Sequence, residues 1–434
     1  MEKSKIPTVT IVTDQFLSLA QGTQQSQGFT DLAYAVVEHP IGMLQKNEVD
    51  AKVDRFFQTI LDAALKWAPS KDAAIIQEKP YPAKTTTFKG TYAELNDLFT
   101  QRQWSLSLPI VPPTPEKVKA MLQGTKRKAD EVVWVVPPRQ GMLTVELVAT
   151  LGVMAGSKPE HMPLLLAAVE AMKHPDVSWR GTSTTTAATV PVFILNGPMI
   201  EKLGLDSGTG VSGPLNPVTN ALGYFANLVG DVVGGSVQPD LDKSTHGSTG
   251  DFVSLIYVEN DKANPWRQSY AEEQGFKKTD SVLTYFGSYL GGANVDHTNT
   301  TGSGLLNTIA LTLVGNAGGI ASCLTDYDKP YSASNGTTFS FVFLCPEHAA
   351  QIQKEFPEKL KVKEYLVKEA ALPYRWYAPS RCDVPADTKP DTWIPRYIKT
   401  DSIKLVVTGG PGKQSQVWSS FVQTSKPASV IVDY

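Results

Sequence analysis

Cysteines, histidines and long apolar runs are scarce in this chain of 434 residues. Its three cysteines lie far apart at positions 323, 345 and 382, which excludes a disulfide-rich scaffold or a CxxC metal site and is typical of a reducing compartment. The six histidines form no HxxxH or HExxH pair, so we expect no bound metal. No segment reaches the roughly 18 apolar residues that cross a membrane. No basic start with an apolar segment marks a secretory signal, and we therefore expect a cytoplasmic protein.

Clustered positive charge is missing as well. Lys and Arg together number 40 against 43 Asp and Glu, and the net charge is −3. No group of basic residues interleaved with aromatic ones offsets this balance, so we expect no nucleic-acid partner.

The sequence also lacks the common nucleotide and hydrolase motifs. Residues 406–415, "VVTGGPGKQS", resemble a phosphate loop, but a Gln follows the Gly-Lys pair and the glycine spacing is wrong. A simple anion site made by Gly409, Gly410 and Lys413 stays open. No G-x-S-x-G nucleophile elbow occurs. We expect no cofactor and no ATP or GTP binding.

The first 68 residues contain two strand–helix units. The apolar run from Pro7 to Val12 predicts a buried strand that leads into a helix, and a second strand is predicted at Tyr34–Val37. Residues 49–64 carry apolar side chains at helical spacing. Two such units form half of a flavodoxin-like, doubly wound sheet, which normally has four or five strands.

The rest of the chain is predicted to form an arm and one larger domain. Residues 69–104 are rich in Pro, Lys and Thr at their start, which predicts a linker or extended arm. Residues 105–434 alternate apolar strands with helical patterns, including a helix from Pro115 and one that contains Leu143 and Leu147. The composition, 41% hydrophobic and 19% charged, is that of a globular protein. The fold class is therefore α/β to α+β, with the half-domain at 1–68 and a mixed domain at 105–434.

Long loops of Gly, Asn and Ser in the larger domain are the first candidate site. Glycines let the backbone approach a ligand and present N–H groups to an anion such as a carboxylate, while Asn side chains both donate and accept. Ordinary turn chemistry is the alternative. The candidate substrate-binding residues here are Asn196, Ser212, Asn216 and Asn220.

Three residues are candidates for moving protons. His246 lies among small polar residues, Glu259 follows the apolar run "FVSLIYV", and His39 follows the second strand. An exposed loop histidine, a capping glutamate and a buried core histidine are the alternatives. Asn260 and Trp266 follow Glu259 in the sequence and are added as substrate-binding candidates.

The sequence also predicts which of these residues meet. Asn196 and Glu259 each end an apolar strand. If the two strands are parallel neighbours, both residues open on the edge where α/β sheets collect ligands. We expect His246 to join them, with Glu259 within hydrogen-bond reach.

Several motifs resemble the UGSC-like proteins, a family named for a (seleno)cysteine-Gly-Ser-Cys motif in a small α/β domain. "IPTVTIVTDQF" and "VVEHPIG" are similar to the C-terminal half of that domain. From about residue 105, "VPPRQGMLTVELVA", "LNGP", "ENDKANPW", "CPEHA" and "GGPG" resemble a larger region associated with it. The resemblance implies thiol- or selenol-assisted reduction or lyase cleavage. The motif itself is absent here, so the reactive cysteine would come from another subunit.

These observations predict an enzyme, or the large subunit of one, that acts on a small polar and anionic organic molecule. One alternative is a lyase or hydratase that needs no cysteine and uses His and Glu as acid and base. The other is a subunit that only binds a small ligand. Because a half-sheet exposes an edge strand, we expect a small cysteine-containing subunit or a second copy of the chain to cover it.

Overall fold

The computed structural model describes most of the chain. The described residues are 6, 8–26, 29, 31–42, 44–68, 79–214, 216–315, 322–329, 338–377 and 382–434. The predicted strand start at Pro7 and the first part of the predicted arm, 69–78, lie outside them.

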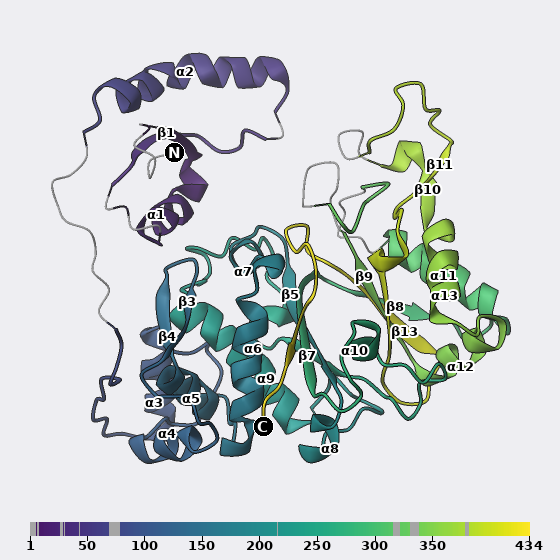
Figure 1. The fold of residues 1–434 in the computed structure, drawn as a ribbon. Coiled ribbons are helices and arrows are strands. Elements are labelled where there is room, and N and C mark those ends of the chain that lie inside the picture. The colour runs from purple at the N-terminus through teal and green to yellow at the C-terminus, as the bar shows by residue number, and fades with distance from the viewer. Residues whose placement is uncertain are drawn as a thin grey trace.

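The N-terminal unit has the predicted order of elements. Strand β1 (Val9–Thr13) is followed by helix α1 (Leu17–Ser26), strand β2 (Ala33–Val37) and helix α2 (Lys46–Leu65). The two strands are parallel, with Val9 opposite Ala33. Figure 1 shows α2 on the side of this unit that faces away from the rest of the molecule, while α1 lies nearer to it. The prediction of two strand–helix units is confirmed, and their likeness to half of a flavodoxin-like sheet stays a prediction.

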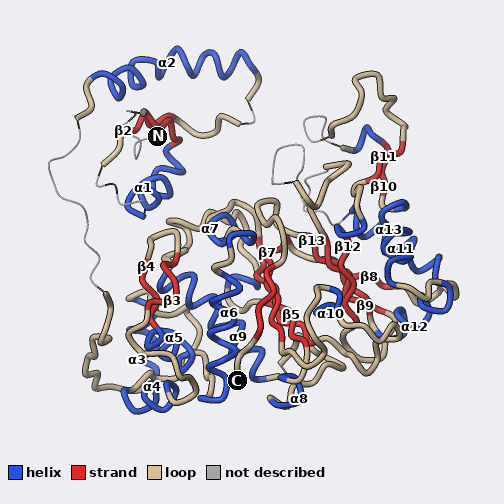
Figure 2. The backbone as a smooth tube through the Cα atoms, viewed as in Figure 1, coloured by secondary structure: helices blue, strands red, loops and turns tan. Residues whose placement is uncertain are grey.

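The centre of the larger domain consists of two four-stranded sheets (Figure 2). The first has the order β14 (Ala428–Ile431), β7 (Val282–Tyr289), β5 (Thr189–Asn196) and β6 (Leu255–Val258). The second has the order β12 (Ile403–Val407), β9 (Ser340–Leu344), β13 (Gln414–Ser419) and β8 (Gly292–Val295). Aromatic rings hold the sheets face to face. Phe286 stacks on Phe341 with ring centroids 4.5 Å apart, and Tyr257 stacks on Phe343 at 4.0 Å.

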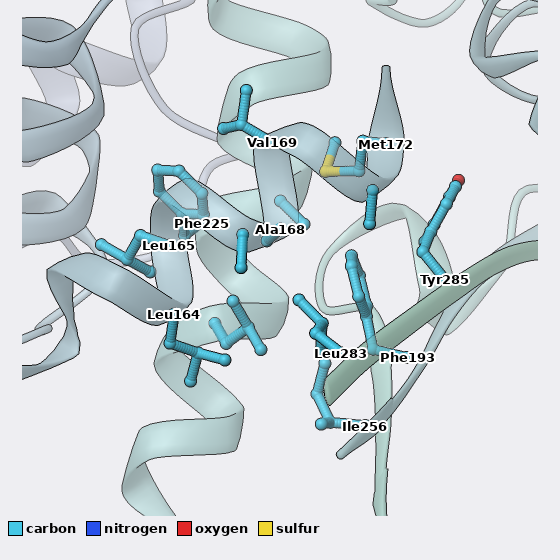
Figure 3. Close-up of a cluster of buried hydrophobic side chains, with 14 of the residues drawn as sticks. Leu164, Leu165, Ala168, Val169, Met172, Phe193, Phe225, Ile256, Leu283 and Tyr285 are labelled. Atoms are coloured by element: carbon cyan, nitrogen blue, oxygen red, sulfur yellow. The ribbon is translucent and has the colours of Figure 1, made fainter. Parts of the chain in front are cut away.

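Helices cover the outer face of each sheet. Helices α6 (Met162–Met172) and α9 (Pro217–Leu228) pack on the first sheet, and Figure 3 shows part of the buried apolar cluster of this region, including Leu164, Met172 and Leu283. Helices α11 (Gly302–Gly315), α12 (Pro346–Glu355) and α13 (Lys359–Glu369) cover the second. The result is a four-layer α/β/β/α sandwich (Figure 1). Because both of its faces are covered, all eight residues of β5 are buried, and this strand reads as a continuous apolar run.

The remaining elements surround this sandwich. They are α3 (Tyr92–Gln101), α4 (Pro115–Leu122), β3 (Val132–Val136), β4 (Gly141–Thr144), α5 (Val145–Met154), α7 (Trp179–Ser183), α8 (Met199–Lys202), α10 (Tyr270–Glu273), β10 (Ala371–Pro373) and β11 (Trp393–Pro395). Helix α3 lies within the predicted arm. Leu143 was expected in a helix and is instead in β4, because residues 141–144 pair with β3 as a hairpin before α5 begins.

Two of the three cysteines are bonded to each other. Cys323 and Cys382 form a disulfide across 59 residues of sequence, and Cys345 is free and buried. The sequence spacing gave no sign of this pairing, since connectivity depends on which loops meet in space. Among the described residues, no helix is both long and apolar enough to cross a bilayer.

Candidate functional sites

Four strands of the sandwich end at one junction between the two sheets. Strands β5 and β6 are parallel neighbours in the first sheet, and β9 and β12 are parallel neighbours in the second. Just beyond the ends of β6 and β12, Glu259 pairs with Thr408 in an antiparallel bridge that joins the sheets. The carboxyl ends of these strands therefore meet, as the parallel arrangement of β5 and β6 was predicted to allow.

Asn196 and Glu259 are in contact at this junction. The Asn196 amide donates a hydrogen bond to the Glu259 carboxyl, and the backbone N–H of Tyr270 donates to it at 2.9 Å. Glu259 is 1% exposed, and burial raises its pKa to about 8. A carboxyl with this pKa is mostly protonated at neutral pH. Their predicted meeting is confirmed, while a catalytic role for either residue stays a prediction.

His246 does not lie near Asn196 and Glu259. The Ser248 hydroxyl donates to the Thr189 carbonyl at 3.0 Å, which ties the loop of His246 to the start of β5. Glu259 lies at the opposite end of that strand, about 23 Å away for seven steps of roughly 3.3 Å. The predicted hydrogen-bonded pair of His246 and Glu259 is therefore wrong, because both lie on loops around one strand but at different ends of it.

The glycine-rich and asparagine-rich loops come together at the junction. The Gly409 N–H donates to the Ser207 carbonyl at 2.9 Å, and a Cβ on Gly410 would lie 2.0 Å from the Thr209 hydroxyl. The Asn260 amide donates to the Gly409 carbonyl at 3.3 Å. These loops border an open cavity of about 540 Å³.

Some candidate binding residues have structural partners instead. The buried Asn216 amide donates to the carbonyls of Asp206 and Val211 and so closes its own loop. Trp266 donates from its indole to the Phe356 carbonyl at 3.0 Å, and the exposed Lys413 reaches the His297 carbonyl at 3.4 Å. Ser212 is exposed in the loop before α9, and Asn220 is half-buried in α9.

His39 lies at the carboxyl edge of the N-terminal sheet. The Thr13 hydroxyl is 3.2 Å from Nδ1 of His39, and the His39 backbone N–H donates to Asp14 at 3.2 Å. His39 is exposed, so it is not the buried core histidine of the alternative interpretation.

A second cavity, of about 330 Å³, lies at the amino end of β5. Its walls come from α7, the segment 227–238 and the loop 242–252. Asp231 lies in a π-helical turn, Val229–Val233, that extends α9, and such turns are frequent at functional sites. Gly230 allows close packing here, since a Cβ at this position would lie 2.7 Å from the Trp179 ring. We call this cavity the Asp231 cavity.

In the residues that line the Asp231 cavity, three buried polar atoms have no hydrogen-bond partner within the described part of the chain. They are the Ser105 hydroxyl, the Trp179 indole nitrogen and the Ser236 hydroxyl. These residues are 9%, 6% and 5% exposed. Buried polar groups are nearly always paired in native proteins, so these atoms are suited to contact a polar ligand.

The charged side chains that line the Asp231 cavity are acidic. Burial, with the nearby carboxylates of Asp242 and Asp251, raises the pKa of Asp231 to about 8. Gln238 donates to both of those neighbours, at 2.7 Å to Asp242 and 3.1 Å to Asp251. No described residue that lines the cavity is Lys, Arg or His. The cavity therefore favours a neutral or cationic polar ligand over an anion.

Sequence reasoning missed Asp231 although it examined the neighbouring loop. His246 lies between Asp242 and Asp251 in the chain, but its own side chain is exposed and does not line the cavity. The signal was the spacing of three of the four aspartates in "GDVVGGSVQPDLDKSTHGSTGD", namely Asp231, Asp242 and Asp251, which form a cluster only when the loop folds back. Among the described residues, no group of side chains is arranged to hold a metal ion.

The N-terminal unit docks beside the Asp231 cavity through α1. The Ser18 hydroxyl donates to the Asp240 carbonyl at 2.8 Å, and Lys243 donates to Ser18 at 3.2 Å. Arg180 of α7 donates to the Thr23 hydroxyl at 2.6 Å. Both contacted segments continue into walls of the cavity.

Comparison with known proteins found a match for the N-terminal unit. Residues 1–66 match the model of the UGSC family. No curated protein matches the chain. The match covers β1 to α2 and ends before the arm, so the resemblance of the residues from 105 onward stays a prediction. Residues 1–66 are therefore similar to the UGSC family, and in this chain they precede a four-layer α/β domain.

Proposed function

We propose that this protein is an enzyme that acts on a small polar molecule in the Asp231 cavity by acid–base chemistry. The observation that carries the proposal is the set of three unpaired, buried polar atoms around one carboxyl of raised pKa. Ser105, Trp179 and Ser236 would orient a substrate that bears hydroxyl or amino groups, and Asp231 would exchange a proton with it.

The charge of the Asp231 cavity does not favour the anionic substrate that the sequence predicted. An anionic substrate would face the carboxylates of Asp242 and Asp251 without a basic side chain among the described lining residues. We therefore propose a neutral or cationic substrate. A protonated Asp231 at neutral pH supports the lyase or hydratase alternative, in which a neutral acid gives its proton to a departing hydroxyl or amine.

The experiment screens for substrates and then tests Asp231. A panel of polyols, hydroxy acids and amines is incubated with the protein in D₂O, and ¹H NMR follows elimination products and the loss of C–H signals to deuterium. Asp231→Asn should lower the rate about 10²- to 10⁴-fold, as loss of a general acid–base does. The matched control is Asp240→Asn, because Asp240 is exposed on the same loop and does not line the cavity.

The pH dependence and ligand binding separate an enzyme from a binding subunit. If protonated Asp231 is the acid, the rate should fall as the pH rises through about 8. A panel compound that raises the melting temperature of the wild type and of Asp231→Asn equally, with no exchange or turnover in either, would favour the binding subunit.

We also propose that a partner covers the N-terminal unit. In the described part of the chain β1 pairs only with β2, Ile11 of β1 is 55% exposed, and no residue of α2 is buried. A small α/β subunit or a second copy of the chain would fill this role. Multi-angle light scattering of the full chain, with Ile11→Lys as the variant, tests the second copy, since only a dimer built on this edge would dissociate.

A further inference from the structure

The single free thiol of the protein lies at the start of a long helix. Cys345 is the N-cap residue of α12, a helix of ten residues that follows the end of β9. The other two cysteines are bonded to each other. The amino end of a helix carries a partial positive charge, which stabilises a thiolate.

Cys345 and His348 occupy the two helix positions whose side chains face each other, the N-cap and N3. Ser415, on the neighbouring strand β13, lies beside both. Its hydroxyl is 2.9 Å from Nδ1 of His348 and 3.8 Å from the Cys345 sulfur. The Cys345 backbone N–H donates to the same hydroxyl at 3.2 Å. Thiol, imidazole and hydroxyl therefore form one cluster.

The hydrogen bond of Nε2 determines which nitrogen of the His348 imidazole carries a hydrogen. Nε2 of His348 is 3.1 Å from the backbone carbonyl of Asp296. A carbonyl can only accept, so Nε2 carries a hydrogen and Nδ1 is the atom that exchanges a proton with the thiol. Burial opposes charge on both residues, but the contact with His348 leaves the pKa of Cys345 lowered, and the contact with Cys345 leaves that of His348 raised.

A second observation points to a ligand at this cluster. Asn294 lies directly opposite Ser415 in the antiparallel pair of β8 and β13, so the two side chains share a face of the sheet. Asn294 is 4% exposed, and its side-chain oxygen has no hydrogen-bond partner among the described residues. Pro346 and Glu347, the next two residues after Cys345, line the junction cavity of about 540 Å³.

We propose that Cys345 and His348 form a nucleophilic thiol site for a small electrophile that enters from the junction cavity. The proton of the thiol passes to Nδ1 of His348. The sulfur then forms a bond to the electrophilic carbon, and the bond from that carbon to its leaving group breaks. The leaving group departs with the electron pair and takes the proton from His348, while the unpaired Asn294 oxygen accepts a hydrogen bond from the electrophile. This site is separate from the Asp231 cavity and does not depend on its proposed function.

The test measures alkylation of the native, non-reduced full chain by iodoacetamide between pH 5.5 and 9.5. Mass spectrometry follows the peptide that contains Cys345. We expect the midpoint of the pH–rate profile to lie below the value of an ordinary thiol, about 8.5. His348→Gln should move the midpoint up and lower the rate at pH 6.5 about tenfold, which corresponds to one pKa unit. Lys354→Gln is the matched control, since Lys354 is exposed in the last turn of the same helix and does not line the junction cavity, and its rate should change less than about twofold.

Two outcomes would overturn the proposal. One is a native thiol that does not react at any pH while the urea-unfolded chain does, which would show an inert buried cysteine. The other is a wild-type midpoint at the ordinary value that His348→Gln leaves in place. Because the first outcome and the wild-type midpoint are both measured on the wild type, the proposal stays testable even if His348→Gln does not fold: a wild-type midpoint at the ordinary value would by itself contradict it. Circular dichroism and the melting temperature check the fold of each variant.

Discussion

The N-terminal unit and the larger domain use similar strand and helix patterns but bury them very differently. In β1 no residue is fully buried, and in the 20 residues of α2 none is. In β5, β7 and β9 every residue is buried. The larger domain packs two sheets face to face and covers them with two helical layers, whereas the described residues of the N-terminal unit form two strands without an opposite layer. Apolar periodicity therefore predicts an element, while burial depends on whether a second layer exists to cover it.

The largest expected effect is on the N-terminal unit when it is separated. We expect residues 1–68 expressed alone to be unfolded or aggregated, because 68 residues with an open sheet edge bury too little apolar surface. Circular dichroism and size-exclusion chromatography provide the measurement. A monomeric fragment with a cooperative melting transition would contradict this expectation and would show that the unit is a domain.

Two phenylalanine truncations compare the burial of the two regions directly. Phe193 of β5 is fully buried in the cluster shown in Figure 3. Phe57 on α2 is 54% exposed. Phe193→Ala should lower the free energy of unfolding by about 3–5 kcal/mol. Phe57→Ala should change it by less than about 0.5 kcal/mol. Urea denaturation of the full chain measures both, and equal losses would mean that α2 is covered in solution.

Two ion pairs of equal length give a second comparison. Lys359 is 2.6 Å from Glu273 in the larger domain, with both side chains at most 10% exposed. Lys46 is 2.6 Å from Asp50 in α2, with side chains 89% and 57% exposed. Lys359→Met should cost about 3 kcal/mol or more, because it leaves a buried carboxylate with less compensation. Lys46→Met should cost at most about 0.5 kcal/mol, as for exposed helix pairs. Similar losses for the two variants would remove burial as the explanation.

Burial in the larger domain should also make the stability of the protein depend on pH through Glu259. Below pH 4.5 this carboxyl is protonated in both the folded and the unfolded chain. Between pH 4.5 and about 8 only the unfolded chain ionises it, so the stability of the folded state falls as the pH rises, and the loss is constant above about 8. Glu259→Gln removes this loss. Relative to the wild type, the variant should therefore gain stability, on the order of 1–3 kcal/mol, between pH 5 and pH 8. Urea denaturation at both values measures it, and parallel changes in the two proteins would contradict the raised pKa.

The site prediction succeeded where it rested on strand direction. The meeting of Asn196 and Glu259 followed from two apolar strands ending in polar residues, because parallel neighbours bring their carboxyl ends together. It failed for His246, whose loop returns to the other end of β5. Asp231 was missed because its neighbours Asp242 and Asp251 lie on a loop, and a loop has no periodicity that reveals which way it folds. Cys345 and His348 lie three positions apart in the sequence, but their importance depends on Ser415 and Asn294, which come from other strands.

The sequence by itself determined the local elements of this protein. The spacing of apolar residues and the helix-start signals placed the two strand–helix units of the N-terminal unit, helix α4 and the buried strands. These elements depend on interactions between residues close in the chain. Only the tertiary structure decided which strand ends meet, which cysteines pair and which polar atoms are left without partners. Those features depend on contacts between residues tens to hundreds of positions apart, and a side chain at such a contact carries no local pattern that marks it.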